Sequence, residues 1–492
     1  MAKLPHYQLF IDGRWTDGGS GQVMQSLNPA TGSPWCSFAC ASSDDVNQAV
    51  AAARRVLDDP LWRDMTQTAR GKLLYRLADL IAEHAPDIGR IETTDSGKLL
   101  AETASQTANV ADYYRYYAGL ADKIEGAVLP IDKPNMHVFT RREPIGVVAA
   151  IVPWNAQMFL TATKLGPALA AGCAVVLKAS EIAPAPMLEF ARLVEQAGFP
   201  SGVVSVITGD AENCAIPLTR HPDVDRIAFT GGPDTARHVV RNSAENFAVT
   251  TLELGGKSPI LVFDDADLDG AANGLIAGNF GASGQSCVAG SRGLVHRPIF
   301  EALADKIAEK AKGIVVGDPL SAETHVGPLC TRAQIARIEH TLAKAQDQGA
   351  QIRFGGAPLD RAGNFMAPTL VACDSAQTET LHVEMFGPVM SLLPFDDEEE
   401  AIALANQTVY GLGSGVFTQN IARAHRVSGW LRAGICWINT YRAVSPIAPF
   451  GGVNQSGYGR EAGVDAILDY TRTKTTWINT SDAPMANPFV MR

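Results

Sequence analysis

Short runs of β-branched and apolar residues, each followed by a stretch with helical periodicity, recur through the first half of the chain. Five such runs lie at residues 145–152, 174–177, 203–207, 226–230 and 250–254. Strands buried on both faces read as continuous apolar runs, and the helices between them act as crossovers in a parallel sheet. The sequence therefore predicts an α/β fold.

A sixth apolar run, at residues 258–263, follows Gly255 and Gly256 and leads into an acidic turn and a helical stretch. The chain has 492 residues. Single hydrophobic cores stop growing at about 250–300 residues, so at least two domains are expected. We predict that a second α/β domain begins near residue 256.

Residues 44–97 have the apolar period of helices, with Ser43 and Asp44 as candidates for the N-cap. Pro60 and Pro86 are the main helix breakers in this stretch. We expect a helical layer that wraps the first domain.

Two further segments resemble exposed strands. Residues 128–142 alternate around Pro130 and Pro134 like a hairpin, and residues 469–478 form a strand-like segment near the C-terminus. Exposed strands far apart in sequence indicate edge pairing or a contact between subunits.

Composition limits the class of molecule that this protein is expected to bind. The formal net charge is −11, without runs of Lys or Arg, which argues against nucleic acid and anionic membranes. The eight cysteines include no C-x-x-C pair, and no metal site is expected. The N-terminus has no apolar signal-like segment, and no apolar stretch approaches ~18 residues. We expect a cytoplasmic protein that acts on a small molecule.

The chemistry centres on Cys287, in Gly-Ala-Ser-Gly-Gln-Ser-Cys, and on Glu253, which lies 34 positions upstream (287 − 253). A thiolate can add to an aldehyde carbonyl, and after a hydride leaves, a carboxylate can activate the water that cleaves the thioester. If Glu253 ends the first domain, both groups can face an interdomain cleft, a common place for active sites.

These residues belong to a larger pattern that resembles the aldehyde dehydrogenase superfamily, from about residue 11 to residue 478. Seven motifs follow the order of that superfamily: Pro-Trp-Asn at 153–155, Lys-Ala-Ser-Glu at 178–181, Phe-Thr-Gly at 229–231, Glu-Leu-Gly-Gly-Lys at 253–257, Gly-Gln-Ser-Cys at 284–287, Glu-Met-Phe-Gly-Pro at 384–388 and Pro-Phe-Gly-Gly at 449–452. Each is weak alone, but seven in order are specific.

The resemblance implies a subunit of three parts. A Rossmann-like NAD-binding domain would comprise residues 1–125 and 144–255, and an α/β catalytic domain residues 256–455. A small β oligomerisation element would comprise residues 126–143 and 469–492. The superfamily favours a homodimer or a homotetramer.

The resemblance also assigns catalytic roles. Cys287 would be the nucleophile, Asn155 and the backbone N–H of Cys287 would stabilise the oxyanion, and Glu253 would be the base for deacylation. The alternatives are an inert buried cysteine, an asparagine that caps a turn, and a glutamate that satisfies a strand end or pairs with Lys257.

The matching cofactor positions are Trp154, Lys178, Glu181, Gly231, Gly232, Glu384 and Phe386. Lys178 and Glu181 resemble the pair that holds the adenosine ribose. A carboxylate there repels a 2′-phosphate, which favours NAD and leaves NADP as the less favoured alternative. A solvated ion pair at a helix start is the other interpretation of these two residues.

Several positions depart from the superfamily pattern, among them Ala156 and Gln157, which stand where many relatives have Phe-Pro. Gly232 replaces a common serine near the pyrophosphate, and Ala236 replaces a glycine that opens the following helix. Alanine is small and favours a helix, so the helix N-terminus can still bind phosphate. Asn454 stands where lysine is usual, and we carry over no role for it.

The positions that match the family's substrate pocket are Gln157, Met158, Thr163, Ser286, Val288, Val444 and Phe450. Most are small or apolar, and Thr163 replaces a bulky aromatic residue. They predict broad specificity for a medium-sized apolar, branched or aromatic aldehyde. Arg442 offers an alternative, because a guanidinium there could clamp a carboxylate and make the enzyme a semialdehyde dehydrogenase. A salt bridge at the surface or at a subunit interface is the competing role for Arg442.

The predicted activity is NAD-dependent oxidation of an aldehyde to the acid through a cysteine thiohemiacetal and a thioester. A CoA-acylating relative typically lacks the glutamate, so Glu253 argues against that reaction. A phosphorylating type would need several basic residues in the substrate tunnel, and Arg442 alone is too little. A catalytically inactive structural relative is the alternative from another class.

Overall fold

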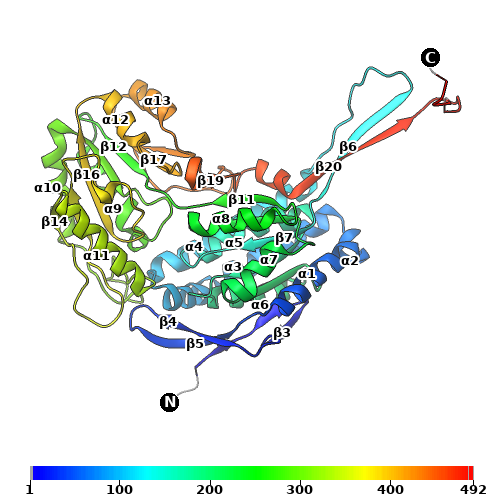
Figure 1. Cartoon of the computed structure of the whole chain (residues 1–492), viewed down its shortest axis with the longest axis horizontal. Coiled ribbons are helices and arrows are strands. Elements are labelled where there is room, and N and C mark those ends of the chain that lie inside the picture. Colours follow the sequence, from blue (N-terminus) through cyan, green and yellow to red (C-terminus); the bar gives the residue numbers. More distant parts are fainter. Residues whose placement is uncertain (1–3, 486, 491–492) are drawn as a thin grey trace.

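An eight-stranded sheet organises the first half of the chain (Figure 1). The computed structural model describes residues 4–485 and 487–490. The sheet has the order β19-β11-β10-β7-β8-β9-β2-β3. Its members are β2 (Leu9–Ile11), β3 (Arg14–Thr16), β7 (Val147–Ile151), β8 (Ala174–Ala179), β9 (Val204–Thr208), β10 (Arg226–Thr230), β11 (Val249–Glu253) and β19 (Gly457–Tyr458). The five strands from β7 to β11 are parallel, which confirms the predicted α/β fold.

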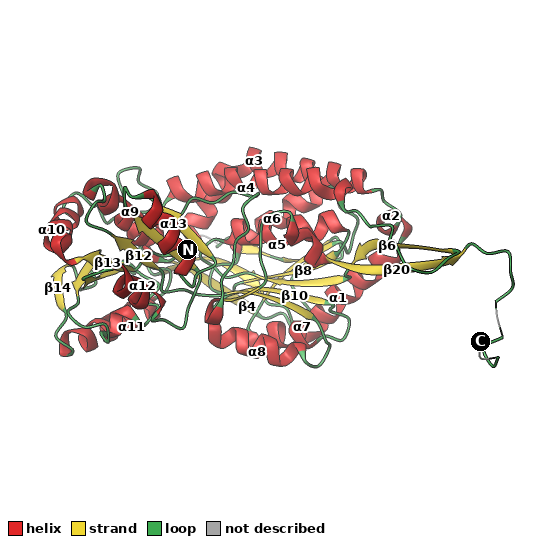
Figure 2. Ribbon diagram, turned by 90° about the horizontal axis from the view of Figure 1, so that it is seen from above, coloured by secondary structure: helices red, strands yellow, loops and turns green. Residues whose placement is uncertain are grey.

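The connections of this sheet reverse direction between β7 and β10. Strands β7, β8 and β9 follow one another in one direction, and the chain then crosses back to β10 and β11. Helices α5 (Gln157–Ala171) and α6 (Ala185–Ala197) cover one face, while α7 (Ile216–Arg220) and α8 (Pro233–Ser243) cover the other (Figure 2). Ligands bind at such a reversal, outside the carboxyl ends of the strands.

The helical layer predicted for residues 44–97 comprises α1 (Ser43–Asp58), α2 (Pro60–Arg63) and α3 (Gln67–Ser96). It is extended by α4 (Leu100–Leu120), which packs along α3 (Figure 2). The N-cap predicted at Ser43 or Asp44 is wrong, because Ser42 accepts the N–H of Asp45 in a capping box. Pro60 occupies the first turn of α2, whereas Pro86 lies inside α3 without ending it.

A second sheet of seven strands begins at Pro259, close to the predicted start of the second α/β unit. Its order is β14-β15-β16-β13-β12-β17-β18, and β14 is antiparallel to its neighbour. The strands are β12 (Pro259–Val262), β13 (Arg292–His296), β14 (Gln351–Phe354), β15 (Thr369–Ala372), β16 (Val389–Phe395), β17 (Gly413–Phe417) and β18 (Ile435–Ile438). The helices are α9 (Leu268–Phe280), α10 (Phe300–Ala311), α11 (Arg332–Asp347), α12 (Glu398–Asn406) and α13 (Ile421–Trp430).

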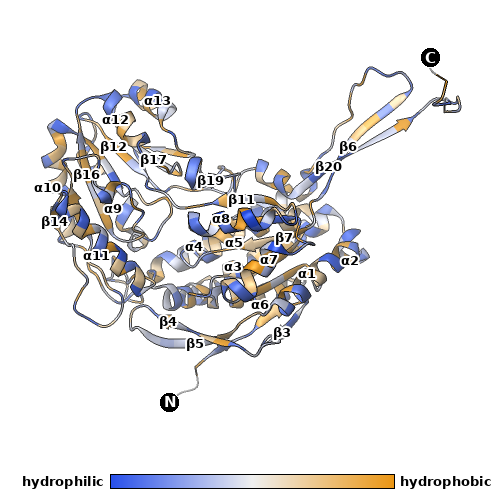
Figure 3. Ribbon diagram, in the orientation of Figure 1, coloured by the Kyte–Doolittle hydropathy of each residue, from blue (hydrophilic) through white to orange (hydrophobic). Residues whose placement is uncertain are grey.

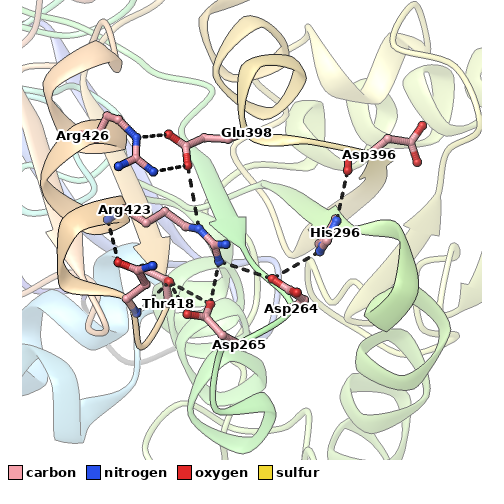
Figure 4. Close-up of polar contacts among 9 residues, drawn as sticks. Asp264, Asp265, His296, Asp396, Glu398, Thr418, Arg423 and Arg426 are labelled. Carbon is pink, nitrogen blue, oxygen red and sulfur yellow. Dashed lines mark hydrogen bonds and ion pairs between the residues drawn. The ribbon is translucent and has the colours of Figure 1, made fainter.

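An ion-pair network joins the carboxyl ends of strands in this second sheet (Figure 4). Arg423 contacts Asp265 at 2.9 Å and Asp264 at 3.3 Å, and Arg426 binds Glu398 through two contacts of 2.6 and 2.7 Å. Exposed pairs of this kind contribute about 0–1 kcal/mol each. The network lies away from Cys287, which precedes the central strand β13 and so lies toward the amino ends of these strands.

Strands β6 (Met136–Pro144) and β20 (Thr471–Asn479) pair with each other and project from the body as a two-stranded arm (Figure 1). The two exposed strands predicted from sequence are therefore partners. Trp477 is 55% exposed and Ile478 is 45% exposed, and apolar colour marks the outer end of β20 (Figure 3). Residues 1–3, 486 and 491–492, which fall in the predicted segments 1–125 and 469–492, lie outside the described residues.

A small sheet of β1 (His6–Tyr7), β5 (Ser33–Ala39) and β4 (Val23–Asn28) lies beneath the first unit. One apolar core fills the first unit, and two further cores lie on either side of the second sheet. Within residues 4–485 and 487–490, no helix is both long and apolar enough to cross a membrane.

Candidate active site

Two cavities meet at Cys287. One has a volume of about 400 Å³ and the other about 320 Å³. Asn155, Leu160 and Cys287 line both of them. A thiol at such a junction can contact a substrate in one cavity and a cofactor in the other.

The smaller cavity lies at the carboxyl ends of β7, β10 and β11, where the sheet connections reverse. Its other lining residues are Pro153, Trp154, Ile182, Thr230, Gly231, Gly232, Glu253, Leu254, Gly255, Thr331, Ala333, Gln334, Arg337, Glu384 and Phe386. Five of the seven predicted cofactor residues are in this set. The rings of Trp154 and Phe386 meet edge to face with centroids 5.5 Å apart. We call this cavity the cofactor cleft.

Gly232 is the N-cap of α8, and no side chain caps that helix. A Cβ atom built on Gly232 would meet nothing within 4 Å, so open space adjoins the helix N-terminus. Uncapped backbone N–H groups bind phosphate well. Ala236 is buried in the first turns of α8, as its small size allows. This end of the cleft fits a pyrophosphate.

Lys178 and Glu181 are joined by an ion pair of 2.6 Å. Lys178 lies in β8 and its side chain is 7% exposed, so the interpretation as a solvated pair at a helix start is wrong. The pair precedes Ile182, which lines the cofactor cleft. Its position suits a ribose at that end of the cleft, although neither residue lines the cleft itself.

The turn that leads to Cys287 has an uncommon backbone. Ala282, Ser283 and Gly284 have φ values of 52°, 54° and 73°, in the left-handed region. A Cβ atom on Gly284 would lie 2.1 Å from the carbonyl oxygen of Gly387, so only glycine fits there. The Ser283 hydroxyl donates to the carbonyl of Gly327 at 3.0 Å, which holds the turn in place.

The Cys287 side chain is partly exposed, and its surroundings favour the neutral thiol. Burial raises the pKa of Cys287 to about 12, and the carboxyl groups of Glu384 and Glu253 act in the same direction. Arg442 lowers this pKa. The nucleophilic thiolate therefore requires a nearby base or an added positive charge.

Asn155 follows β7 and is buried. Its side-chain amide Nδ2 donates to the carbonyl of Gln285 at 3.0 Å, which places the amide beside the Cys287 turn. An amide has two N–H groups, so the second is available to an oxyanion formed at Cys287. The contact crosses between two units of the fold and is no local turn cap.

Glu253 ends β11 and is 3% exposed. Neither carboxyl oxygen has a hydrogen-bond partner among the described residues, so the alternative pairing with Lys257 is not formed. Burial raises the pKa of Glu253 well above its usual range, as does Glu461, while Lys164 and Arg460 lower it. A carboxylate with a raised pKa is an effective general base near neutral pH.

Behind Glu253 lies a buried polar cluster that sequence reasoning missed. Lys164 Nζ donates to Glu461 Oε1 at 2.5 Å and to the Thr230 hydroxyl at 2.6 Å. The Thr163 hydroxyl donates to Glu461 Oε2 at 2.6 Å. The sequence contained one signal for this cluster, which is Lys164 among the mostly apolar residues of α5. A buried lysine normally needs a charged partner.

The larger cavity, which we call the substrate cavity, is lined by Lys98, Gln106, Asn109, Val110, Asp112, Tyr113, Asn155, Ala156, Phe159, Leu160, Ala282, Gln285, Ser286, Cys287, Val288, Arg442, Val444, Ser445, Pro446 and Phe450. Five predicted pocket residues are among them: Ser286, Val288, Arg442, Val444 and Phe450. The cavity has apolar and polar walls, so its chemistry is mixed.

The prediction is wrong for Gln157, Met158 and Thr163, which do not belong to the described lining. All three side chains are buried in the body of the protein. Helix α5 instead turns Phe159 and Leu160 toward the cavity. The α4 residues of the lining also escaped prediction, because no local pattern shows that α4 packs beside Cys287.

Arg442 lies in the wall of the substrate cavity. Its backbone φ is +65°, and its Nη1 donates to the carbonyl of Ala277 at 3.2 Å. No described carboxylate lies within 4.0 Å of its guanidinium, so the alternative of a surface salt bridge within this chain is not formed, whereas a bridge at a subunit interface would involve another chain.

The sequence and the fold both have known counterparts. The profile of the Aldehyde dehydrogenase family matches residues 15–476. The chain is 54% identical over 490 residues to (Z)-2-((N-methylformamido)methylene)-5-hydroxybutyrolactone dehydrogenase from Acinetobacter baylyi, an alignment that covers 99% of this chain and 100% of the relative.

Solved structures agree with the sequence comparison. PnpE from Pseudomonas sp. WBC-3, solved also in complex with nicotinamide adenine dinucleotide, is 42% identical with a TM-score of 0.95, over 98% of this chain and 99% of that one. The NAD+ complex of an aldehyde dehydrogenase from Bacillus cereus is 39% identical with a TM-score of 0.94, over 96% of both chains.

Proposed function

The chain belongs to the aldehyde dehydrogenase family, and from that premise we propose that it oxidises a medium-sized aldehyde to the carboxylic acid, with NAD as cofactor and water as acyl acceptor. The observation that carries this proposal is the position of Cys287 at the junction of the two cavities. Asn155 lines both cavities and Glu253 lines the cofactor cleft, so the three groups that the chemistry needs are together.

The cofactor cleft supports NAD. In our proposal residues 1–125 and 144–255 bind it, with the pyrophosphate at the N-terminus of α8 and the adenosine ribose near Lys178 and Glu181. The carboxylate of Glu181 disfavours the 2′-phosphate of NADP. PnpE and the aldehyde dehydrogenase from Bacillus cereus, both similar in structure, have been solved with NAD. When bound, NAD supplies the acceptor for the hydride that leaves the substrate carbon.

The first half of the reaction belongs to Cys287 and Asn155. The Cys287 sulfur adds to the aldehyde carbon as a thiolate, after its proton has passed to water. The Asn155 amide and the backbone N–H of Cys287 stabilise the oxyanion that forms. Loss of hydride from this adduct leaves a thioester on Cys287.

The second half belongs to Glu253. Its carboxylate removes a proton from water, the water attacks the thioester carbon, and the acid leaves as the Cys287 thiol is restored. The two unpartnered oxygens of Glu253 are free to accept hydrogen bonds from that water. This role favours hydrolysis over transfer to another acyl acceptor.

The substrate cavity supports a medium-sized substrate. A volume of about 400 Å³ lies within the range of small-molecule sites. Phe159 and Phe450 form an apolar wall, with centroids 6.2 Å apart, and one methylene against such a wall changes discrimination by about 1–3 kcal/mol. Broad specificity follows. The relative from Acinetobacter baylyi is named for a hydroxybutyrolactone with an N-methylformamido group.

The β6–β20 arm supports self-association. An isolated two-stranded sheet is marginally stable in water, and this one projects from the body with exposed apolar residues at its end. In our proposal residues 126–143 and 469–492 form the oligomerisation element of a homodimer or homotetramer that works in the cytoplasm. Light scattering of the purified full chain tests the assembly.

NADH formation tests the activity. Purified full-length protein is incubated with aliphatic, aromatic and ω-carboxy aldehydes, with NAD and NADP in parallel, and the acid product is quantified. The proposal expects one NADH per acid formed, with NAD preferred. Absence of NADH with every aldehyde, in protein that binds NAD, would instead favour a catalytically inactive relative.

A further inference from the structure

We propose that Arg442 binds a carboxylate of the substrate, so that aldehydes bearing a carboxylate are preferred over neutral aldehydes of the same length. This inference rests on the proposed function and specifies its substrate class. It assigns to Arg442 the role of a specificity-determining residue in the wall of the substrate cavity.

The guanidinium of Arg442 lies over the turn that leads to Cys287. A Cβ atom built on Gly281 would be 2.4 Å from Arg442 Nη1, so the guanidinium occupies the space that a side chain at position 281 would fill. Gly281 precedes Cys287 by six positions (287 − 281). Arg442 and Cys287 line the same cavity of about 400 Å³, so a group bound by Arg442 and an aldehyde carbon at Cys287 can belong to one small molecule.

The backbone holds Arg442 in this place. A φ of +65° is uncommon for a residue other than glycine, and it persists only where surrounding contacts maintain it. One contact is the hydrogen bond from Nη1 to the carbonyl of Ala277. A guanidinium has five N–H donors, so several remain for a ligand.

Three charged residues line the substrate cavity: Lys98, Asp112 and Arg442. Of these, Arg442 makes no salt bridge within 4.0 Å to a described residue. Lys98 pairs with Glu92 at 3.1 Å, and Asp112 pairs with Arg115 at 3.1 Å. Of the carboxylates facing this wall, Glu102 lies closest to Gly281, and its Oε1 accepts the N–H of Ala282 at 2.9 Å. An unpaired, partly buried guanidinium is a good partner for a carboxylate, which it can bind through two parallel hydrogen bonds.

The rest of the cavity suits the same ligand. The polar side chains of Asn109 and Ser445 line it along with Arg442, while Phe159 and Phe450 line its apolar wall. A short carbon chain with an aldehyde at one end and a carboxylate at the other matches this order of surfaces. A wholly apolar aldehyde would leave Arg442 without a partner.

The test compares 4-oxobutanoate with its methyl ester, which have the same carbon chain but differ in charge. The measured quantity is the ratio of kcat/KM for the acid to that for the ester, by NADH formation with saturating NAD. We expect the wild type to favour the acid and Arg442→Met to lower the ratio by about 10–100-fold, mainly through KM of the acid. Arg442→Lys should retain part of the preference, because it keeps the charge and loses the planar fork.

The ratio removes a confounding effect. Arg442 also lowers the pKa of Cys287, so its loss slows the thiol toward both substrates equally and cancels in the ratio. Arg14→Met, at an exposed arginine in β3, is the matched control and should leave the ratio unchanged. Glu102→Gln removes the nearby negative charge while keeping an acceptor for Ala282, and should raise the ratio.

The outcomes separate this inference from the proposed function. If the wild type oxidises both compounds and Arg442→Met leaves the ratio unchanged, Arg442 is no carboxylate site, and aldehyde oxidation stands. If neither compound nor any other aldehyde yields NADH, the proposed function itself fails. If Arg442→Met is inactive with both compounds, the kcat/KM ratios of Arg442→Lys and Glu102→Gln test the inference instead. Wild-type ratios in both of these variants would overturn it.

Discussion

Lys164 and Glu461 form a buried ion pair with 2.5 Å between Nζ and Oε1, although 297 positions separate them in the chain. The pair lies behind Glu253, whose pKa responds to both charges. Because each member is almost completely buried, the pair is not screened by solvent, and the loss of one partner leaves an uncompensated charge. The pKa of Glu253, the proposed base, thus depends on residues that line neither cavity.

Glu461→Gln is expected to shift the pH dependence of thioester hydrolysis. Glu461 raises the pKa of Glu253, so removal of its negative charge lowers that pKa, and Glu253 becomes ionised at lower pH. The acidic limb of the kcat profile should move to lower pH. Thr163→Val removes a neutral hydrogen bond to Glu461 and should shift the limb less. If the acidic limb of Glu461→Gln stays in place or moves to higher pH, the coupling between Glu461 and Glu253 is contradicted.

Cys287→Ala is expected to abolish NADH formation, with residual turnover at least about 10³-fold below wild type, because no other thiol of the described residues lines both cavities. NAD binding should persist, since the cofactor cleft retains Trp154 and Phe386. Quenching of tryptophan fluorescence by NAD measures this binding. Turnover close to that of the wild type would refute the assignment of Cys287 as the nucleophile.

Glu253→Gln is expected to preserve a burst of NADH in the first turnover and to slow the steady state by about 10²–10⁴-fold. The amide cannot deprotonate water, so the thioester accumulates. Stopped-flow absorbance measures the burst, and mass spectrometry detects the acylated Cys287. Loss of the burst would show that Glu253 is also needed to activate the thiol.

Gly232→Ser is expected to tighten NAD binding by a few-fold and to raise the free energy of unfolding by a few tenths of a kcal/mol. Gly232 has the extended backbone of an N-cap, and open space adjoins it, so a serine hydroxyl fits. Titration calorimetry and urea unfolding measure the two effects. Gly231→Ser is the contrasting variant, because a Cβ there would lie 2.4 Å from the ring of Phe229. Weaker NAD binding in Gly232→Ser would argue against a pyrophosphate at this helix end.

Because of the titration of Asp95, we expect the free energy of unfolding to fall as pH rises from about 4 to 7. Burial raises the pKa of Asp95 from its ordinary 3.8 to about 7, although its carboxyl group accepts from Trp35 and from the N–H of Ala185. The folded state therefore binds a proton that the unfolded state has lost in this window, and that stabilisation disappears as pH approaches 7.

Urea unfolding of Asp95→Asn at pH 5 and pH 7 checks this expectation. The variant should be less stable overall, because the amide cannot make all of these contacts. The informative quantity is the change in unfolding free energy between the two pH values, which should be smaller in the variant than in the wild type. An equal change in both proteins would show that Asp95 does not titrate in this window.

The sequence predicted the parts of this protein that depend on local patterns. The β7–β11 strands were visible because strands buried on both faces need continuous apolar runs. The chemistry of Cys287, Glu253 and Asn155 was visible because each lies in a short motif at a strand end or turn. The sequence did not predict that β6 pairs with β20, because an exposed strand does not specify its partner.

The tertiary structure decided what depends on how elements face one another. Thr163 contacts Glu461 and not the substrate cavity, because the rotation of α5 about its axis is set by packing. Arg442 lines the cavity because Gly281, from another segment, leaves room for its guanidinium. The sequence by itself thus determined the fold class and the family and predicted the reacting groups, whereas only the packing of distant segments determined the surroundings of Glu253 and the chemistry of the cavity wall. The physical reason is that side-chain direction and burial depend on contacts between residues hundreds of positions apart.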